Sequence, residues 1–235
     1  MLVTTRSANA GRVSAIPLLA VALLASLLST TVPPASVSTM LNATAAATTV
    51  ASPTALTFTV PASASSGRIS ITNTTGTGAS AADFIVVPAG YSASDIACTV
   101  RLTPGGASED FQLGTPSTHG LILFDGAQDT YYTLQFEQLV YSPSNAPVTY
   151  KVYTPENAQL LTGNIGYGYR PTIHLPKLPS TGTYSVLVSP GIATLSSFVS
   201  LAADPVLGID GAATSVALGS ASSTTRMIFS APANQ

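Results

Sequence analysis

The stretch Lys177-Leu-Pro-Ser-Thr-Gly-Thr-Tyr-Ser-Val-Leu-Val-Ser-Pro190 has the pattern of a turn that leads into a β-strand. Pro179 fixes its own φ angle and Gly182 tolerates a positive φ, so both residues favour a turn. After the turn, two sets of side chains alternate: Tyr184, Val186 and Val188 against Ser185, Leu187 and Ser189. A period of two places one set on a buried face, and Pro190-Gly191 ends the pattern. The stretch therefore predicts a strand over Thr183–Val188.

Similar patterns recur through the chain, with turn signals at intervals of roughly 8–15 residues, the rhythm of a β-sandwich. The alternation is clearest in Tyr132–Glu137 and Val148–Tyr153. Besides Thr183–Val188, the strands predicted after residue 95 are Cys98–Thr103, Glu109–Leu113, Gly120–Phe124, Thr130–Tyr141, Val148–Tyr153, Thr172–Leu175 and Phe198–Leu201. Before it they are Thr57–Val60, Arg68–Thr72 and Phe84–Val87, with a loop over Asn73–Gly78. No amphipathic helical pattern of useful length follows residue 32.

Composition supports the same fold class. Hydrophobic residues make up 46% of the chain, which is enough for a core, whereas disordered chains are poor in apolar residues. Charged residues make up only 8% and the formal net charge is −2, so a basic surface for nucleic acid is not expected. We predict an all-β chain of tandem Ig-like or jelly-roll-like β-sandwiches after an N-terminal hydrophobic helix.

Residues 1–32 form a separate unit. Arg6 and Arg12 precede the apolar run Ser14–Leu28, the pattern of a secretory signal peptide. An uncleaved membrane anchor over Val13–Val32 is the alternative, since this segment is about long enough to span a bilayer. In both cases the positive residues favour an extracellular or cell-surface location for the body of the chain.

Residues 33–90 resemble part of a bacterial Ig-like IPT/TIG domain. The residues that carry the resemblance are Leu41–Val50, Leu56–Ile71 and Ala82–Val87, and Val60-Pro-Ala-Ser-Ala-Ser-Ser-Gly-Arg-Ile-Ser-Ile71 has the characteristic pattern of the family. The Ser-Pro and Gly-rich first half of that family is missing. The resemblance therefore implies a partial β-domain.

Residues 91–206 resemble the β-sandwich repeats, similar to bacterial pre-peptidase C-terminal domains, that accompany IPT/TIG and Rhs/YD-repeat modules in large bacterial surface proteins. The resemblance is carried by Gly105-Gly-Ala107, Leu113-Gly114, Leu121–Asp125 and Leu178–Pro190. It implies a bacterial surface protein in which such modules follow one another.

An internal repeat extends this interpretation. Gly105–Phe124 aligns with Asp210–Phe229 at an offset of 105 residues, about the size of one sandwich. Residues 207–235 are therefore predicted to be the truncated start of a second repeat. Its exposed strand edges, over Arg226–Ser230, are expected to permit self-association by strand addition. Whether the chain is complete or a piece of a larger gene stays open.

No nucleophile elbow, phosphate loop, dinucleotide fingerprint or zinc-spaced cluster is present. The lone Cys98 is expected to be a small buried hydrophobe, and His119 and His174 to be structural. The acidic turn containing Asp125 and Asp129 is a candidate Ca²⁺ site, with a solvated hairpin turn as the favoured explanation. No cofactor is predicted.

Aromatic residues form the other candidate site. Most tyrosines belong to alternating strands, for which core packing is the simpler explanation. Tyr167, Tyr169 and Arg170 instead lie in a Gly-rich loop, where binding residues are often displayed.

The sequence therefore predicts a non-catalytic structural or adhesion module, a spacer or stalk of a bacterial surface protein. A carbohydrate- or calcium-binding accessory module of a secreted enzyme or toxin is the alternative. Partners are expected to be protein or carbohydrate at the cell surface, with no nucleic acid and with membrane contact only through residues 1–32. The ligand and the oligomeric state stay open.

Overall fold

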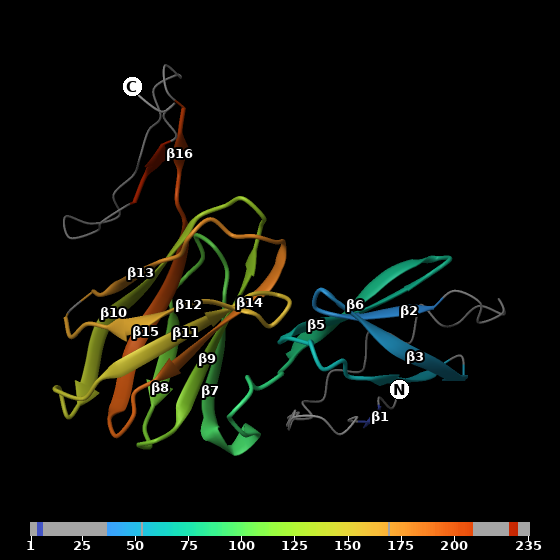
Figure 1. Cartoon of the computed structure of the whole chain (residues 1–235), viewed down its shortest axis with the longest axis horizontal. Coiled ribbons are helices and arrows are strands. Elements are labelled where there is room, and N and C mark those ends of the chain that lie inside the picture. The colour runs from blue at the N-terminus through green and yellow to red at the C-terminus, as the bar shows by residue number, and fades with distance from the viewer. Residues whose placement is uncertain (1–3, 7–36, 53, 169, 209–225, 230–235) are drawn as a thin grey trace.

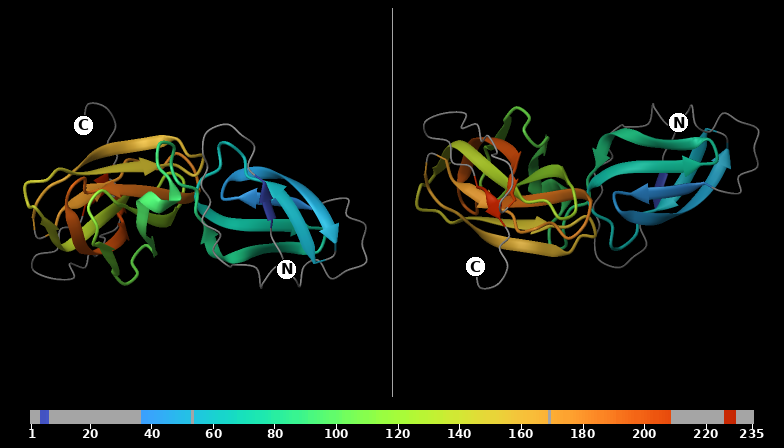
Figure 2. Two further views of the ribbon diagram at one scale, coloured as in Figure 1. Left: turned by 90° about the horizontal axis from the view of Figure 1, so that it is seen from below. Right: turned by 90° about the horizontal axis from the view of Figure 1, so that it is seen from above.

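A computed structural model describes residues 4–6, 37–52, 54–168, 170–208 and 226–229. They form two lobes, an N-terminal module (residues 37–90) and a β-sandwich (residues 96–203), which lie side by side (Figures 1 and 2). The described part of the chain is nearly all strand, with the short 3-10 helix η2 (Ala93–Asp95) between the lobes. Within it, no helix is long and apolar enough to cross a membrane. The predicted signal or anchor, residues 1–32, lies outside the described residues except for Thr4–Arg6.

Two sheets pack face to face in the sandwich, in agreement with the predicted fold class. The five-stranded sheet has the order β12-β11-β14-β9-β7 and the four-stranded sheet the order β13-β10-β15-β8. Neighbouring strands are antiparallel except for the parallel pair β7 and β9. The strands are β7 (Ile96–Leu102), β8 (Glu109–Leu113), β9 (His119–Gly126), β10 (Tyr132–Ser142), β11 (Val148–Tyr153), β12 (Gln159–Ile165), β13 (Thr172–His174), β14 (Gly182–Ser189) and β15 (Thr194–Ala203).

The main core lies between these two sheets, and the alternating side chains supply it as predicted. Tyr184, Val186 and Val188 of β14 are fully buried there, with Phe124 stacked on the Tyr184 ring at a centroid distance of 5.4 Å. Cys98 packs half-buried against the same core. Strand β12 is an addition to the predicted strands, because its burial pattern does not alternate regularly.

A β-bulge changes the phase of β10. Tyr132, Leu134 and Phe136 face the core, as predicted, but Leu139 and Tyr141 continue the buried set. The register against β15 shifts between Glu137 and Val140, and Gln138 has a positive φ of 51°. Because of the extra residue, the side chains that face the core change from even-numbered to odd-numbered positions, and Val140 is left 58% exposed.

Strand β14 is buried on both faces, which its alternating sequence does not predict. Leu187 points away from the main core and forms a second cluster with Leu121 and Leu123 of β9. The run Leu121-Ile-Leu-Phe124 has apolar side chains at every position, the pattern of a strand covered on both sides. Over β9 and β14, the outer face of the five-stranded sheet is therefore a packed interface.

The N-terminal module has one sheet, in the order β1-β4-β3-β2-β5-β6. The strands are β1 (Thr4–Arg6), β2 (Ser38–Leu41), β3 (Thr44–Ser52), β4 (Ala55–Thr59), β5 (Gly67–Asn73) and β6 (Gly76–Phe84). Leu56 and Phe58 of β4 share a buried cluster with Ile71 of β5. A flat sheet would separate β4 from β5 by roughly 14 Å, so the sheet curls around this cluster. The sequence resemblance implies a partial Ig-like β-domain here, and the described strands form one curled sheet.

Two local predictions for this module were wrong. The predicted loop Asn73–Gly78 is a tight hairpin in which Asn73 Oδ1 accepts hydrogen bonds from the Thr75 and Gly76 N–H groups, at 2.9 and 3.1 Å. These hydrogen bonds satisfy the backbone N–H groups of the turn, so the turn is short and β6 begins at Gly76. The predicted strand Phe84–Val87 is the end of β6 followed by an irregular segment, where Ser66 Oγ bonds both backbone groups of Val86.

The tail contributes β16 (Val206–Leu207) and β17 (Ile228–Phe229), a parallel pair next to the sandwich (Figure 1). Within the predicted truncated repeat, residues 209–225 and 230–235 lie outside the described residues.

Candidate functional site

The two acidic candidates each have a basic partner. Asp125, at the end of β9, accepts hydrogen bonds from Arg101 Nη2 at 2.5 Å and Thr183 Oγ1 at 2.7 Å. Asp129 has a positive φ of 65° and forms an ion pair with Lys177, at 2.8 Å. Among the described residues, no group of three or more His, Cys, Asp or Glu side chains is placed to hold a metal ion. The acidic turn is thus arranged around ion pairs within the protein.

The pKa of Asp125 lies below its ordinary value. Burial acts to raise this pKa, but the hydrogen bond from Thr183 and the Arg101 guanidinium outweigh it. Hydrogen bonds and positive charge both favour the carboxylate over the neutral acid. Asp125 is therefore held as a carboxylate by Arg101 and Thr183.

The Gly-rich loop presents one of its aromatic residues to solvent. Tyr167 is 64% exposed and packs its ring edge-on against Tyr141, at a centroid distance of 5.0 Å. Arg170 Nη2 lies 4.0 Å from the Glu137 carboxylate. Tyr169 lies outside the described residues.

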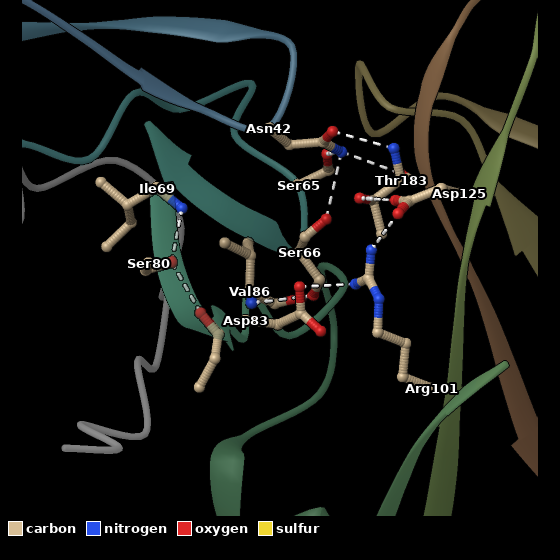
Figure 3. A network of polar contacts seen from close by, with 11 residues as sticks. Asn42, Ser65, Ser66, Ile69, Ser80, Asp83, Val86, Arg101, Asp125 and Thr183 are labelled. Atoms are coloured by element: carbon tan, nitrogen blue, oxygen red, sulfur yellow. Dashed lines mark hydrogen bonds and ion pairs between the residues drawn. The ribbon is translucent and has the colours of Figure 1, made fainter. Parts of the chain in front are cut away.

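The densest polar contacts are at the joint, defined here as the interface between the N-terminal module and the sandwich. Asn42, in the β2–β3 turn, directs its amide toward β14 (Figure 3). Its Nδ2 donates to Thr183 O at 2.8 Å, and its Oδ1 accepts from Thr183 N at 2.9 Å. The side chain therefore pairs with the Thr183 backbone as a neighbouring strand would. Asn42 adopts the positive φ of 52° that Asn tolerates better than most residues.

Close backbone approach shapes this part of the joint. Asn42 Nδ2 also donates to Ser65 Oγ at 2.8 Å, and Ser65 Oγ donates across the joint to Pro155 O. A Cβ atom at Gly182 would lie 2.8 Å from Pro155 Cβ, so only glycine fits there without displacement. Gly182, which the sequence predicts as a turn residue, is thus required by the close approach of Pro155 as well as by its own backbone conformation.

An arginine bridges the two lobes. Arg101 of β7 donates from Nη1 to Asp83 of β6 at 2.6 Å, while its Nη2 binds Asp125 (Figure 3). The Asp83 side chain is 12% exposed and Arg101 25%, so this half of the bridge is shielded, whereas Asp125 is 65% exposed. The bridge fixes β6 against the open edge of the five-stranded sheet.

Beside these polar contacts lies an apolar seam. Ile85 of the N-terminal module, Tyr91 between the lobes and Ile96 at the start of β7 pack on the cluster of Leu121, Leu123 and Leu187. The Tyr91 ring also packs edge-on against His119, with centroids 4.7 Å apart. Burial lowers the pKa of His119. The connecting segment is therefore part of the packed interface.

A second polar cluster lies where the tail leaves the sandwich. Thr133 Oγ1 donates to the buried carboxylate of Asp204 at 2.7 Å and lies 2.9 Å from His174 Nδ1. A hydroxyl has one proton, so His174 Nδ1 must be the donor in the second contact. A histidine that donates to the hydroxyl does not act as its base. The cluster borders a cavity of ≈ 200 Å³ that Arg226 also lines.

Sequence reasoning missed Asn42 and Arg101 as joint residues. Asn42 stands out only as the first residue of an Asn-Ala-Thr sequon. Arg101 is one of eight Lys and Arg residues in the chain and lies within a predicted strand. Its charge is noticeable in the sequence, but no acidic residue nearby in the sequence indicates its partner.

Comparison with protein families and with curated proteins finds no match. Among solved structures, the pre-peptidase C-terminal domain of a collagenase from Bacillus anthracis is 10% identical, with a TM-score of 0.34, covering 44% of this chain and 93% of that one. A periplasmic inhibitor of g-type lysozyme from Aeromonas hydrophila is 13% identical, with a TM-score of 0.28, covering 46% of this chain and all of that one. Likenesses this distant carry no argument about function. The β-sandwich assignment is based on the strand pairing itself.

Proposed function

We propose that this chain is a non-catalytic spacer of the extracellular surface, in which successive β-modules are joined by packed interfaces. The observation that carries the proposal is the joint. Asn42 pairs with a backbone unit of β14, and Arg101 bridges carboxylates of both lobes. The connecting segment packs into the apolar seam. A stalk has to hold the distance and direction between its ends, and a packed joint does this where a Gly/Ser-rich linker does not.

Nuclear spin relaxation of backbone amides tests this proposal on the whole chain. A fixed joint gives the amides of the N-terminal module and of the sandwich the same rotational correlation time. Two clearly different correlation times in the wild-type chain would contradict the proposal. Leu187→Ser, which places a hydroxyl in the seam, is expected to make the two correlation times diverge at temperatures below the unfolding transition of either lobe.

The location is also part of the proposal. Its support is the positively charged N-terminal region followed by an apolar run. The association with IPT/TIG and Rhs-type modules belongs here too, supported by the sequence resemblance alone. Intact mass of the chain recovered from its host, with its compartment recorded, tests the location. A full-length chain found in the cytosol would contradict it.

A carbohydrate-binding role is the second candidate, favoured by the exposed Tyr167. Tyr167 contacts the Tyr141 ring and is 64% exposed as a residue, which leaves an aromatic side chain at the surface for stacking on a sugar. Pull-down with insoluble cellulose and chitin measures this directly. Binding lost in Tyr167→Ala but kept in Phe198→Ala, an exposed aromatic on β15, would support the role.

A further inference from the structure

The outer face of β9 carries a titratable side chain at each end of the apolar seam. Leu121 and Leu123 of this strand belong to the seam itself. Because side chains alternate along a strand, His119 and Asp125 lie on the same face as these leucines. Asp125 is paired with Arg101, whereas His119 is the first residue of β9 and lies half-buried beside the connecting segment. The seam is thus bounded by a paired carboxylate at one end and by a histidine at the other.

The connecting segment packs directly on His119. The Tyr91 ring lies edge-on to the imidazole, with the centroids 4.7 Å apart, and Lys151 Nζ of β11 lies 5.7 Å from the centroid of the same Tyr91 ring. Ile96 pairs with His119 in the sheet and packs into the seam. Tyr91 therefore rests on side chains from two strands of the sandwich, and its contact with His119 helps to hold the lobes together.

The buried nitrogen of His119 suits only the neutral ring. Nδ1 is buried, and none of the described residues forms a hydrogen bond with it. In a neutral imidazole with its proton on Nε2, Nδ1 carries no proton, whereas both nitrogens carry one in the imidazolium. A charged N–H that is buried without an acceptor is costly. Protonation of His119 therefore works against the packed arrangement.

Burial of the imidazole lowers the pKa of His119 below its ordinary value of 6.5. Two charged side chains face the ring and act in opposite directions, since Asp95 of the connecting segment raises this pKa and Lys151 lowers it. The Asp95 carboxylate already accepts hydrogen bonds from the N–H and the hydroxyl of Ser92, at 2.6 and 2.8 Å. The neighbouring strands β7 and β14 contain one charged residue, Arg101, which lies at the other end of the seam.

We propose that the joint is a pH-sensitive hinge, in which protonation of His119 releases Tyr91 and the connecting segment from the sandwich and lets the two lobes reorient. The inference rests on the spacer role proposed above, because it concerns the same joint and adds its regulation. The released state, in which water surrounds His119, binds the proton more readily than the packed state does. The packed joint therefore has its full stability well above pH 6.5 and loses stability as the pH falls below that value.

Spin relaxation of backbone amides in the full chain, recorded from about pH 8 to about pH 5, tests the hinge. The lobes should share one rotational correlation time at pH 8 and have different times at pH 5. The chain has two histidines, and histidine is the side chain whose ordinary pKa lies in this range. His119→Phe keeps an aromatic ring against Tyr91 but takes no proton, so its lobes should share one time throughout. His174→Gln, which removes the other imidazole, should respond as the wild type does.

The titration of the His119 imidazole gives a second measurement, which needs no substitution. The midpoint of its ring-proton chemical shift should lie below pH 6.5 and coincide with the midpoint at which the correlation times diverge. Asp95→Asn removes the charge that attracts the proton and should move both midpoints to lower pH.

The outcomes separate the hinge from the spacer role. A wild-type chain whose lobes still share one correlation time at pH 5 would overturn the hinge and leave the spacer role intact. Divergence that persists in His119→Phe, or that has a midpoint different from that of the imidazole, would also overturn it. Two different times already at pH 8 would contradict the spacer role and the hinge together.

Discussion

The sandwich buries its apolar side chains between two sheets, whereas the N-terminal module has one curled sheet. Within the described residues, the main core of the sandwich contains twenty-four buried side chains, and the two clusters of the N-terminal module contain three each. Strand β3 of that module has no fully buried residue along its length. Small cores yield little net stability, since burial has to exceed the entropy of ordering the chain. The comparison indicates that the N-terminal module depends on the joint more than the sandwich does.

The largest expected effect is on the free energy of unfolding, which should respond separately in the two cores. Phe136→Ala removes a fully buried ring from the centre of the sandwich and should cost about 3–5 kcal/mol of unfolding free energy. Phe58→Ala in the N-terminal module should lower the urea concentration at which that module unfolds and leave the sandwich folded. Urea denaturation followed by amide resonances of each lobe measures both. If Phe58→Ala destabilised the sandwich as much as Phe136→Ala does, the two cores would not be separate units.

Next in size is the apolar seam. Leu187 is fully buried on the outer face of β14, and Leu187→Ala should cost about 2–3 kcal/mol. Because Ile85 of the N-terminal module and Tyr91 of the connecting segment pack on the same cluster, the N-terminal module should lose stability together with the sandwich. Val186→Ala, on the inner face of the same strand, is the matched control and should affect the sandwich alone. Equal responses of the N-terminal module to both variants would contradict a specific role of the seam.

A smaller effect is expected from the polar side of the joint. Asn42→Gly keeps the positive φ without strain but removes the amide that pairs with Thr183. The Thr183 backbone groups would lose their partners in a partly buried site, at a cost of about 1–3 kcal/mol. Hydrogen exchange at the Thr183 amide should accelerate. Asn73→Gly, whose described bonds lie within its own hairpin, should leave exchange at Thr183 unchanged.

The smallest effect is electrostatic and depends on pH. Because the folded state lowers the pKa of Asp125 below its ordinary value of 3.8, the contribution of this carboxylate to stability is present above about pH 4. It is lost as the pH falls through the lowered folded value. For a pair as exposed as Arg101 and Asp125, the size should be about 1 kcal/mol or less. The melting temperature should therefore fall less steeply between pH 5 and pH 2 in Asp125→Asn than in the wild type, as measured by thermal denaturation. An identical slope would show that the bridge adds nothing measurable.

Local patterns predicted most of the sandwich because a strand with one buried face shows it in its own residues. Glu109–Leu113 and Val148–Tyr153 were predicted with the bounds they have in β8 and β11. The phase change in β10 was not predicted, because Gln138 is unremarkable in sequence and its positive φ is set by pairing with β15. Strand β12 was missed for a related reason, since its side chains are mostly half-buried and form no clear alternation.

By itself, the sequence determined the all-β class, the turn at Gly182 and the core-facing residues of β14, because backbone preference and a period of two are local properties. Only the tertiary structure decided that Leu187 is covered, that Asn42 substitutes for a strand, and that Arg101 joins two distant carboxylates. Asn42 and Thr183 are 141 residues apart, and nothing near either residue indicates the other. Contacts of this kind arise when folded surfaces meet, so they depend on the arrangement of whole modules in space.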